Sequence, residues 1–181
     1  QAVRSSNVAV ANALGAGLVE SPALTGFLPG LCEHLLGQPL KMPSVATWWC
    51  GEEAAFSTVV SDLKNLVIKP VFPDRGVEPV FGARLSEAEQ QLLLQKIRGS
   101  CASWVAQEQV ALSTVPVWEG GSLQPRHLVL RVYAVATNDS WAVMPGGLTR
   151  VTKSLDDFVT SMQRGGGSKD TWVVGTGPEP Q

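Results

Sequence analysis

The order of helical and strand-like segments along the chain restricts its fold more than any other feature. Helical spacing of apolar residues occurs only before Gly99, whereas β-branched and alternating runs dominate after Trp104. A doubly wound parallel sheet would need helices between successive strands throughout, because each parallel connection requires a crossover. The order therefore predicts an α+β fold with antiparallel sheets and packed helices.

Three helices are expected in the first hundred residues. A Ser-Pro pair begins a run of leucines at helical spacing over residues 22–37, and a second helix is expected over 52–64. Ser86 and Glu89 have the spacing of a capping box, in which each side chain accepts a hydrogen bond from the backbone of the other residue. The helix that this pair starts runs to Gly99.

The expected strands are β-branched runs that end at glycine, proline or a turn. Pro70–Gly82 contains three prolines and two glycines, which indicates an ordered loop, and the Asn-Asp pair at 138–139 predicts a β-hairpin over His127–Met144. We expect one sheet that contains Leu66–Lys69, Trp104–Leu112 and this hairpin, with the helix of residues 86–98 packed on it. Further strands are expected at residues 8–19, where a turn follows, and at 171–174.

Size and charge limit the organisation of the chain and its partners. The 181 residues suggest one domain, or one and part of another, and 44% hydrophobic residues suffice for a core. With 14 basic and 16 acidic residues and no basic run, binding to nucleic acid or to an anionic membrane is not expected. We expect a domain over residues 1–174 and a flexible tail over 175–181.

Other features indicate where such a chain resides. Its apolar stretches are shorter than the ~18 residues that a membrane-spanning helix needs, and the N-terminus has no basic-then-apolar signal. Three cysteines at wide spacing fit reduced thiols better than a disulfide framework. A cytoplasmic protein is expected, and patterned sequence that starts at Gln1 suggests part of a longer chain.

Several common catalytic motifs do not fit the sequence. The glycines at 15 and 17 are followed by Glu20, where a dinucleotide fingerprint needs its third glycine, and residues 167–170 lack the order of a P-loop. The two histidines do not have zinc-ligand spacing, and no Gly-x-Ser-x-Gly elbow marks a hydrolase. Rossmann, Walker, zinc and hydrolase chemistry therefore receive little support.

Single polar residues at the ends of apolar runs are the candidates for a binding site. Lys69 ends a Leu-Val-Ile run, where its ammonium could meet phosphate oxygens; the alternative is an exposed lysine at a strand end. Backbone amides of the loop at Gly82 could bind phosphate as well. Gln107 and Glu108 suit the amino group of adenine, unless they are a polar pair on an edge strand. Arg131 lies in a β-branched strand and should be paired or should bind a phosphate or carboxylate.

Eight blocks of the sequence together form a specific pattern. They are Val8–Glu20, Pro43–Cys50, Val67–Pro70, Pro79–Gly82, Val105–Glu108, Leu130–Val135, Val143–Arg150 and Ser161–Trp172. In type and order these blocks resemble the circularly permuted ATP-grasp family, and the last one resembles the block that closes the domain. Family members are much longer, so we expect a C-terminal portion, that is, a partial ATP-grasp unit.

The resemblance implies an ATP-dependent ligase in which two α+β subdomains hold ATP between antiparallel sheets. A carboxylate is phosphorylated, and an amine attacks the acyl phosphate. The implied partners are small-molecule or peptide carboxylates and amines. Lys69 would bind phosphate, the Gly82 loop would cover it, and Gln107 with Glu108 would contact adenine.

Further site residues also follow from the resemblance. Arg131 and Arg150 would be catalytic, because they face charge on phosphate or acyl phosphate, and Lys169 would bind phosphate. Asn12 matches an asparagine that helps to hold Mg²⁺ beside acidic ligands, which the family carries partly upstream; Glu20 is a loop acid that could contribute. Since Mg²⁺ binds mainly through carboxylates and ATP oxygens, the alternative is a nucleotide-binding or interaction module without catalytic activity of its own.

Overall fold

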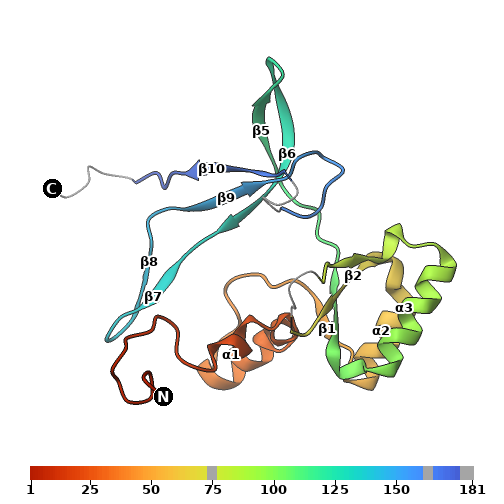
Figure 1. Cartoon of the computed structure of the whole chain (residues 1–181), viewed down its shortest axis with the longest axis horizontal. Coiled ribbons are helices and arrows are strands. Elements are labelled where there is room, and N and C mark those ends of the chain that lie inside the picture. Colours follow the sequence, from red (N-terminus) through yellow and green to blue (C-terminus); the bar gives the residue numbers. More distant parts are fainter. Residues whose placement is uncertain (73–76, 161–164, 176–181) are drawn as a thin grey trace. The chain divides into compact units, whose positions relative to one another are not determined.

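Every strand pair in the described part of the chain is antiparallel, as expected for the α+β fold. The computed structural model describes residues 1–72, 77–160 and 165–175, and it divides into two units, Gln1–Val110 and Ala111–Gln181 (Figure 1). The bounds of the domain expected over 1–174 stay a prediction. Of the expected tail, residues 176–181 lie outside the described residues.

In the first unit, four short strands form one sheet in the order β1, β4, β2, β3. The last of these four strands in the sequence, β4, therefore lies between β1 and β2. The β-branched run at residues 66–68 forms a strand as predicted, whereas β4 ends at Glu108 rather than at Leu112. The strands are β1 (Thr47–Trp49), β2 (Leu66–Pro70), β3 (Val80–Phe81) and β4 (Trp104–Glu108).

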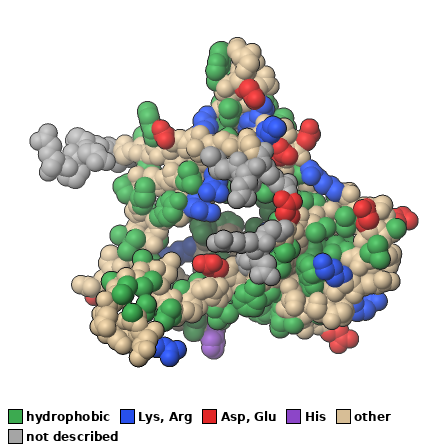
Figure 2. Space-filling model, in the orientation of Figure 1, with side chains coloured by type: hydrophobic (Ala, Val, Ile, Leu, Met, Phe, Trp, Pro, Cys, Tyr) green, Lys and Arg blue, Asp and Glu red, His purple; other side chains and the backbone are tan. Residues whose placement is uncertain are grey.

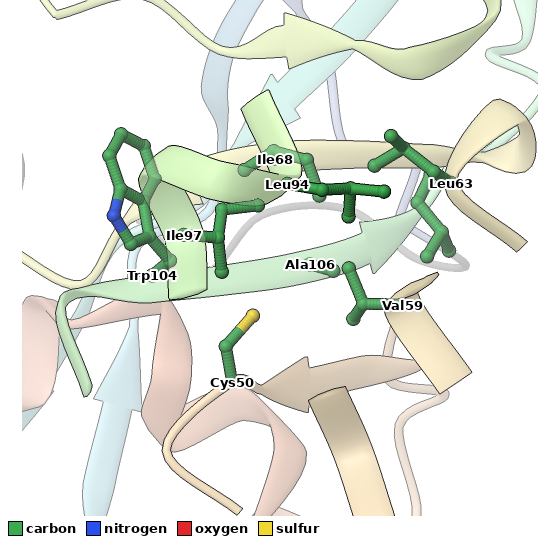
Figure 3. Close-up of a cluster of buried hydrophobic side chains, with 9 residues drawn as sticks. Cys50, Val59, Leu63, Ile68, Leu94, Ile97, Trp104 and Ala106 are labelled. Atoms are coloured by element: carbon green, nitrogen blue, oxygen red, sulfur yellow. The ribbon is translucent and has the colours of Figure 1, made fainter. Parts of the chain in front are cut away.

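Two helices cover one face of this sheet and enclose the main hydrophobic core. Helices α2 (Glu53–Asp62) and α3 (Glu87–Gly99) lie on the same side of the strands (Figure 1). Figure 3 shows Val59 of α2 and Ile97 of α3 beside Ile68 and Ala106 of the sheet, and all four side chains are fully buried. Burial of a large aliphatic side chain contributes ~1.5–3 kcal/mol, so this cluster holds the first unit together.

Helix α3 begins at the predicted capping box. The Ser86 N–H donates to Oε2 of Glu89 at 2.8 Å, and the Glu89 N–H donates to Oγ of Ser86 at 3.4 Å. The Ser86 hydroxyl also donates to Oε2 of Glu89, at 2.7 Å. This bond and the one from the Ser86 N–H hold the pKa of the Glu89 carboxyl below its usual value, because both stabilise its charged form. The Ser86–Glu89 spacing therefore predicted the N-terminal end of this helix correctly.

A buried thiol belongs to the same core. Cys50 is 1% exposed and follows β1, and its N–H donates to the carbonyl oxygen of Trp104. Burial raises the pKa of the Cys50 thiol to about 11, and the nearby Cys101 adds to this effect. At neutral pH Cys50 is therefore protonated and behaves as a small apolar side chain.

The opposite face of the sheet is covered more thinly. The 3₁₀ helix Pro22–Gly26 packs there through Ala23, which joins Val71 and Val105 in a small buried cluster. Helix α1 (Leu28–Leu36) follows and ends at Gly37, where φ is +66°. The helix expected over 22–37 is thus two elements, because proline at position 29 lacks the N–H and the space to continue the preceding turns.

The strand expected over residues 8–19 is wrong. These residues form bends and turns, and the 3₁₀ helix Ala16–Glu20 follows. Asn12 and Gly15 have φ values of +69° and +91°, which belong to the left-handed region and cannot occur within a regular strand. Apolar composition without alternation or a partner strand was too weak a signal here.

The second unit contains strands and no helix among its described residues. Four strands form a sheet in the order β10, β9, β6, β5, and two more form a separate hairpin, β7–β8. A turn at Gly120-Gly121, where both residues have positive φ, joins β5 to β6. The strands are β5 (Thr114–Glu119), β6 (Ser122–Arg131), β7 (Ala134–Ala136), β8 (Trp141–Val143), β9 (Gly147–Val151) and β10 (Gly167–Thr171).

The predicted hairpin is present but shorter than expected. Strands β7 and β8 pair across Thr137–Ser140, where the Thr137 N–H donates to the Ser140 carbonyl oxygen at 2.8 Å. His127–Arg131 belongs instead to β6, so the prediction of a single sheet with Leu66–Lys69 is wrong. Periodicity identifies strands, but it does not determine which distant strands pair.

The strand expected over residues 171–174 is displaced. Strand β10 spans Gly167–Thr171, so it begins four residues before the expected strand, whereas Trp172, Val173 and Val174 lie beyond it and are exposed. Pairing with β9 rather than apolar composition determines this strand.

Candidate functional site

Lys69 lies near the end of β2, on the face of the sheet opposite the helices. Side chains alternate along a strand, so Ile68 enters the core while Lys69 points to the thinly covered face. Val105 is the direct partner of Lys69 on β4, and Gln107 is its diagonal neighbour on the same face. Strand register thus brings Lys69 next to Gln107, a second predicted site residue that lies 38 positions further along the chain.

A line of hydrogen bonds holds the Lys69 ammonium. Nζ of Lys69 donates to Oε1 of Gln107 at 2.6 Å, and Nε2 of Gln107 donates to Oγ1 of Thr47 at 3.1 Å. The Thr47 hydroxyl donates in turn to the Val45 carbonyl oxygen at 2.8 Å. Both ends of the Gln107 amide are engaged, so this amide fixes the ammonium group. The sequence reasoning missed Thr47, although it lies in the block Pro43–Cys50.

The surroundings of Lys69 disfavour its positive charge. The side chain is half-buried, and within the described residues it has no ion pair with a carboxylate. Burial lowers the pKa of the Lys69 ammonium below its usual value of 10.5. A bound anion would offset this desolvation, because an opposite charge favours the protonated form. The group is therefore suited to phosphate.

Glu108 follows Gln107 but points away from Lys69, because neighbouring residues of a strand face opposite sides. Its Oε1 accepts a hydrogen bond from the Ala46 N–H at 3.0 Å, and its own N–H donates to the Ala46 carbonyl oxygen at 3.0 Å. Glu108 thus ties the end of β4 to the segment before β1. Its expected contact with adenine stays a prediction.

Gly82 is buried where β3 ends and a short 3₁₀ helix, Gly82–Arg84, begins. A Cβ at this position would lie 1.8 Å from the carbonyl oxygen of Leu63, so only glycine fits. The Gly82 carbonyl oxygen accepts hydrogen bonds from the Leu85 N–H and from Nε2 of Gln90. Close backbone packing accounts for this glycine, and its role as a phosphate cover stays a prediction.

Arg131 and Arg150 share one face of the four-stranded sheet in the second unit. Arg131 pairs with Leu148 and Arg150 pairs with Val129, so the two arginines are diagonal neighbours across β6 and β9. Neither guanidinium has a hydrogen bond or ion pair within the described residues, and Nε of Arg150 is buried without a partner. A buried donor of this kind is suited to phosphate or carboxylate oxygens.

Lys169 lies on the other face of that sheet. It pairs with Thr149, whose side chain alternates with that of Arg150, so the lysine and the arginine point to opposite sides. Nζ of Lys169 donates to the Pro116 carbonyl oxygen at 2.6 Å. The structure therefore does not bring Lys169 together with the two arginines, and its phosphate contact stays a prediction.

Asn12 is exposed, in the segment that was expected to be a strand. Within residues 1–72, 77–160 and 165–175, no three His, Cys, Asp or Glu side chains form a group that could hold a metal ion. Neither Asn12 nor Glu20 is thus part of an assembled carboxylate site, and the residues present do not fit a resident Mg²⁺ ion.

Comparison with known families identifies the class of protein. Residues 1–152 match the family model described as circularly permuted ATP-grasp type 2. The chain belongs to this family, as the resemblance predicted, and its α+β architecture agrees. The matched region includes Lys69, Gly82, Gln107, Arg131 and Arg150, whereas Lys169 lies beyond it.

Several longer proteins are similar to the chain over nearly its whole length. An uncharacterized protein of Mycobacterium tuberculosis is 38% identical over 173 residues, which are 96% of this chain and 31% of that protein. An uncharacterized protein of Synechocystis is 33% identical, with coverage of 94% and 36%. A Frankia alni protein named "Putative glutamate–cysteine ligase 2-3" is 35% identical, with coverage of 96% and 20%.

The chain therefore spans only 20% to 36% of the length of these three relatives. In the parts of the chain that the structure describes, no helix combines the length and the apolar character needed to cross a membrane.

Proposed function

We propose that this chain is the ATP-binding part of an ATP-dependent ligase that joins a carboxylate to an amine. Membership of the ATP-grasp family supports ATP as the nucleotide, since such domains generally bind ATP with Mg²⁺. Two Frankia relatives carry the name "Putative glutamate–cysteine ligase", which supports amino acids as the carboxylate and amine partners.

The observation that carries this proposal is the Lys69–Gln107 contact. An ammonium group held at 2.6 Å by a neutral amide keeps two of its three protons for a ligand. Desolvation makes its unpaired charge costly, so an anionic phosphate at Nζ gains more there than at an exposed lysine. We assign Lys69 to the phosphates of ATP and Gln107 to positioning Lys69.

We assign two arginines of the second unit, Arg131 and Arg150, to binding the anionic group that is transferred in the reaction. Nε of Arg150, buried without a partner among the described residues, and the guanidinium of Arg131 at the diagonal position supply donors for a phosphoryl or acyl phosphate group. Such fixed donors lower the barrier by stabilising charge as it develops, rather than by acting as nucleophiles. Substitution of Arg150 is therefore expected to slow the reaction more than it weakens ATP binding.

The proposed reaction proceeds in two steps. A carboxylate oxygen attacks the γ-phosphorus of ATP, the bond to the bridging oxygen breaks, and ADP leaves with the electron pair. The amine nitrogen then attacks the carbonyl carbon, the carbon–oxygen bond to phosphate breaks, and the ammonium proton is lost as the amide forms. Because the residues present do not assemble a Mg²⁺ site, we assign no step of this chain to the metal.

Calorimetry with ATP tests the nucleotide assignment. Loss of a charge-assisted hydrogen bond costs ~1.5–3 kcal/mol, so Lys69→Met should weaken ATP binding roughly tenfold or more. Lys64→Met is the matched control, because Lys64 is an exposed lysine in the same unit. Equal affinities for the two variants would refute the phosphate role of Lys69.

The nucleotide products test the reaction. The acyl phosphate route releases ADP and phosphate when a full-length family member is offered pools of amino acids or small peptides. Release of AMP and pyrophosphate would contradict that route. The second candidate, a nucleotide-binding module without activity of its own, is favoured by the small share of the relatives that the chain covers. ATP binding without turnover in any mixture would select it.

A further inference from the structure

The β7–β8 hairpin is an apolar element with no partner in the described structure. Between Val132 and Met144 the only charged residue is Asp139, at the turn. Val135, Trp141 and Val143 are all strongly exposed, and Tyr133 and Met144 are exposed as well. In Figure 2, green apolar side chains reach the surface in the region where Figure 1 places these two strands.

Both faces of this hairpin are apolar. Val135 pairs with Ala142 on one face, and the pairs Ala134–Val143 and Ala136–Trp141 lie on the other. An ordinary surface hairpin has one polar face, and a two-stranded sheet by itself is only marginally stable in water. The outer edges of β7 and β8 also have no partner strand within the described residues. This combination is typical of an element that is enclosed on several sides.

The size of the relatives indicates what encloses it. The M. tuberculosis relative matches this chain along 96% of the chain, yet more than two thirds of the relative lies outside the match. A region of the same polypeptide is present at a high effective concentration, so it binds an exposed surface in preference to a separate protein. The occupant should be uncharged at the contact, because the hairpin offers no charge along either strand.

We propose that the β7–β8 hairpin is the docking element through which this chain packs against an apolar surface of the region that its longer relatives carry outside the matched segment. This inference goes beyond the proposed function, since it makes no use of nucleotide binding. The hairpin belongs to the interior of the longer protein and is not a free surface loop.

Hydrogen exchange tests the docking directly. The probe is the M. tuberculosis relative from which the segment that matches this chain has been removed. Added to the 181-residue chain, it should slow the exchange of backbone amides in Ala134–Ala136 and Trp141–Val143 at least tenfold. A chimera keeps the measurement independent of the folding of that probe: the relative carries this chain in place of its own matched segment. The same slowing is expected in the chimera.

A matched pair of variants assigns the effect to the hairpin. Trp141 and Trp118 are each 70% exposed, and Trp118 lies on β5 within the four-stranded sheet. Trp141→Ser should weaken probe binding about tenfold, whereas Trp118→Ser should leave it within twofold. Val143→Thr is a second test in case Trp141→Ser disturbs the hairpin itself. It keeps the β-branched shape and loses only apolar character, so it should also weaken probe binding.

Three results would overturn the proposal. One is unchanged hairpin exchange in both the mixture and the folded chimera. Another is protection in the chain alone that rises with protein concentration, which would make a second copy the occupant. The third is protection in the chain alone at every concentration, which would assign the cover to residues 1–110 of the same molecule.

Discussion

The two units of the chain differ in how they keep side chains from water. In the first unit, a sheet and two helices enclose a core in which Val59, Ile68 and Ile97 are fully buried. In the second unit, Val151 and Thr152 are the only buried side chains among the described residues. A layered α+β arrangement can thus provide its own core within about a hundred residues, whereas sheets without a covering layer depend on other surfaces.

The largest expected effect separates the two units most clearly. Ile97→Ala removes a buried side chain from α3 and should destabilise the first unit by ~2–5 kcal/mol, through lost burial and a cavity. Leu130→Ala, at an exposed position of β6, should cost less than ~0.5 kcal/mol. Hydrogen exchange of the β4 amides measures the first change, and exchange of the β9 amides measures the second. Similar costs at both positions would remove the contrast between the units.

A second variant tests the backbone packing that closes the core of the first unit. Gly82→Ala would place a methyl group 1.8 Å from the Leu63 carbonyl oxygen, so the backbone must shift. The expected destabilisation is ~1–3 kcal/mol, as for other overpacked sites. Gly99→Ala, at a position with open space around its Cα, is the control and should be close to neutral. Urea unfolding measures the free energy of unfolding of both variants. An unchanged free energy for Gly82→Ala would contradict the close packing of Gly82 against Leu63.

The smallest expected effect concerns pH. Because burial lowers the pKa of Lys69 in the folded chain, the unfolded chain binds more protons between that lowered value and 10.5. The free energy of unfolding should therefore rise with pH in this window, and the cost of the charged lysine is fully present below it. Lys69→Met should lose the rise, and Lys64→Met should keep it. Urea unfolding at a series of alkaline pH values measures both; a rise that persists in Lys69→Met would exclude this lysine as its source.

Local signals predicted the parts of the fold that local interactions determine. The Ser86–Glu89 capping box and the β-branched run at residues 66–68 were identified because each depends on a few adjacent residues. Strands β5 and β6 were missed in part, although Gly120-Gly121 between alternating residues is a hairpin signal. The assignment of the strands to separate sheets was not accessible, since it depends on pairing between distant segments.

The candidate site shows the same division. Lys69 and Gln107 could be selected from the sequence as unusual polar residues, but their contact follows from the register of β2 against β4. Neighbouring residues of a strand always face opposite sides, but only the placement of β4 in the sheet shows that Gln107 faces Lys69 and that Glu108 faces away from it. For Gly82 the sequence suggested a ligand-binding loop, whereas the carbonyl of Leu63, 19 positions earlier in the chain, accounts for the glycine.

The buried thiol of Cys50 makes the first unit a reporter of its own opening. All three cysteines of the chain, Cys32, Cys50 and Cys101, lie in that unit, and the second unit has none. Cys32 and Cys101 are partly accessible, whereas Cys50 becomes available to an alkylating reagent only when the core separates. The rate at which mass spectrometry detects modified Cys50 therefore gives the opening equilibrium of one half of the molecule, without interference from the other.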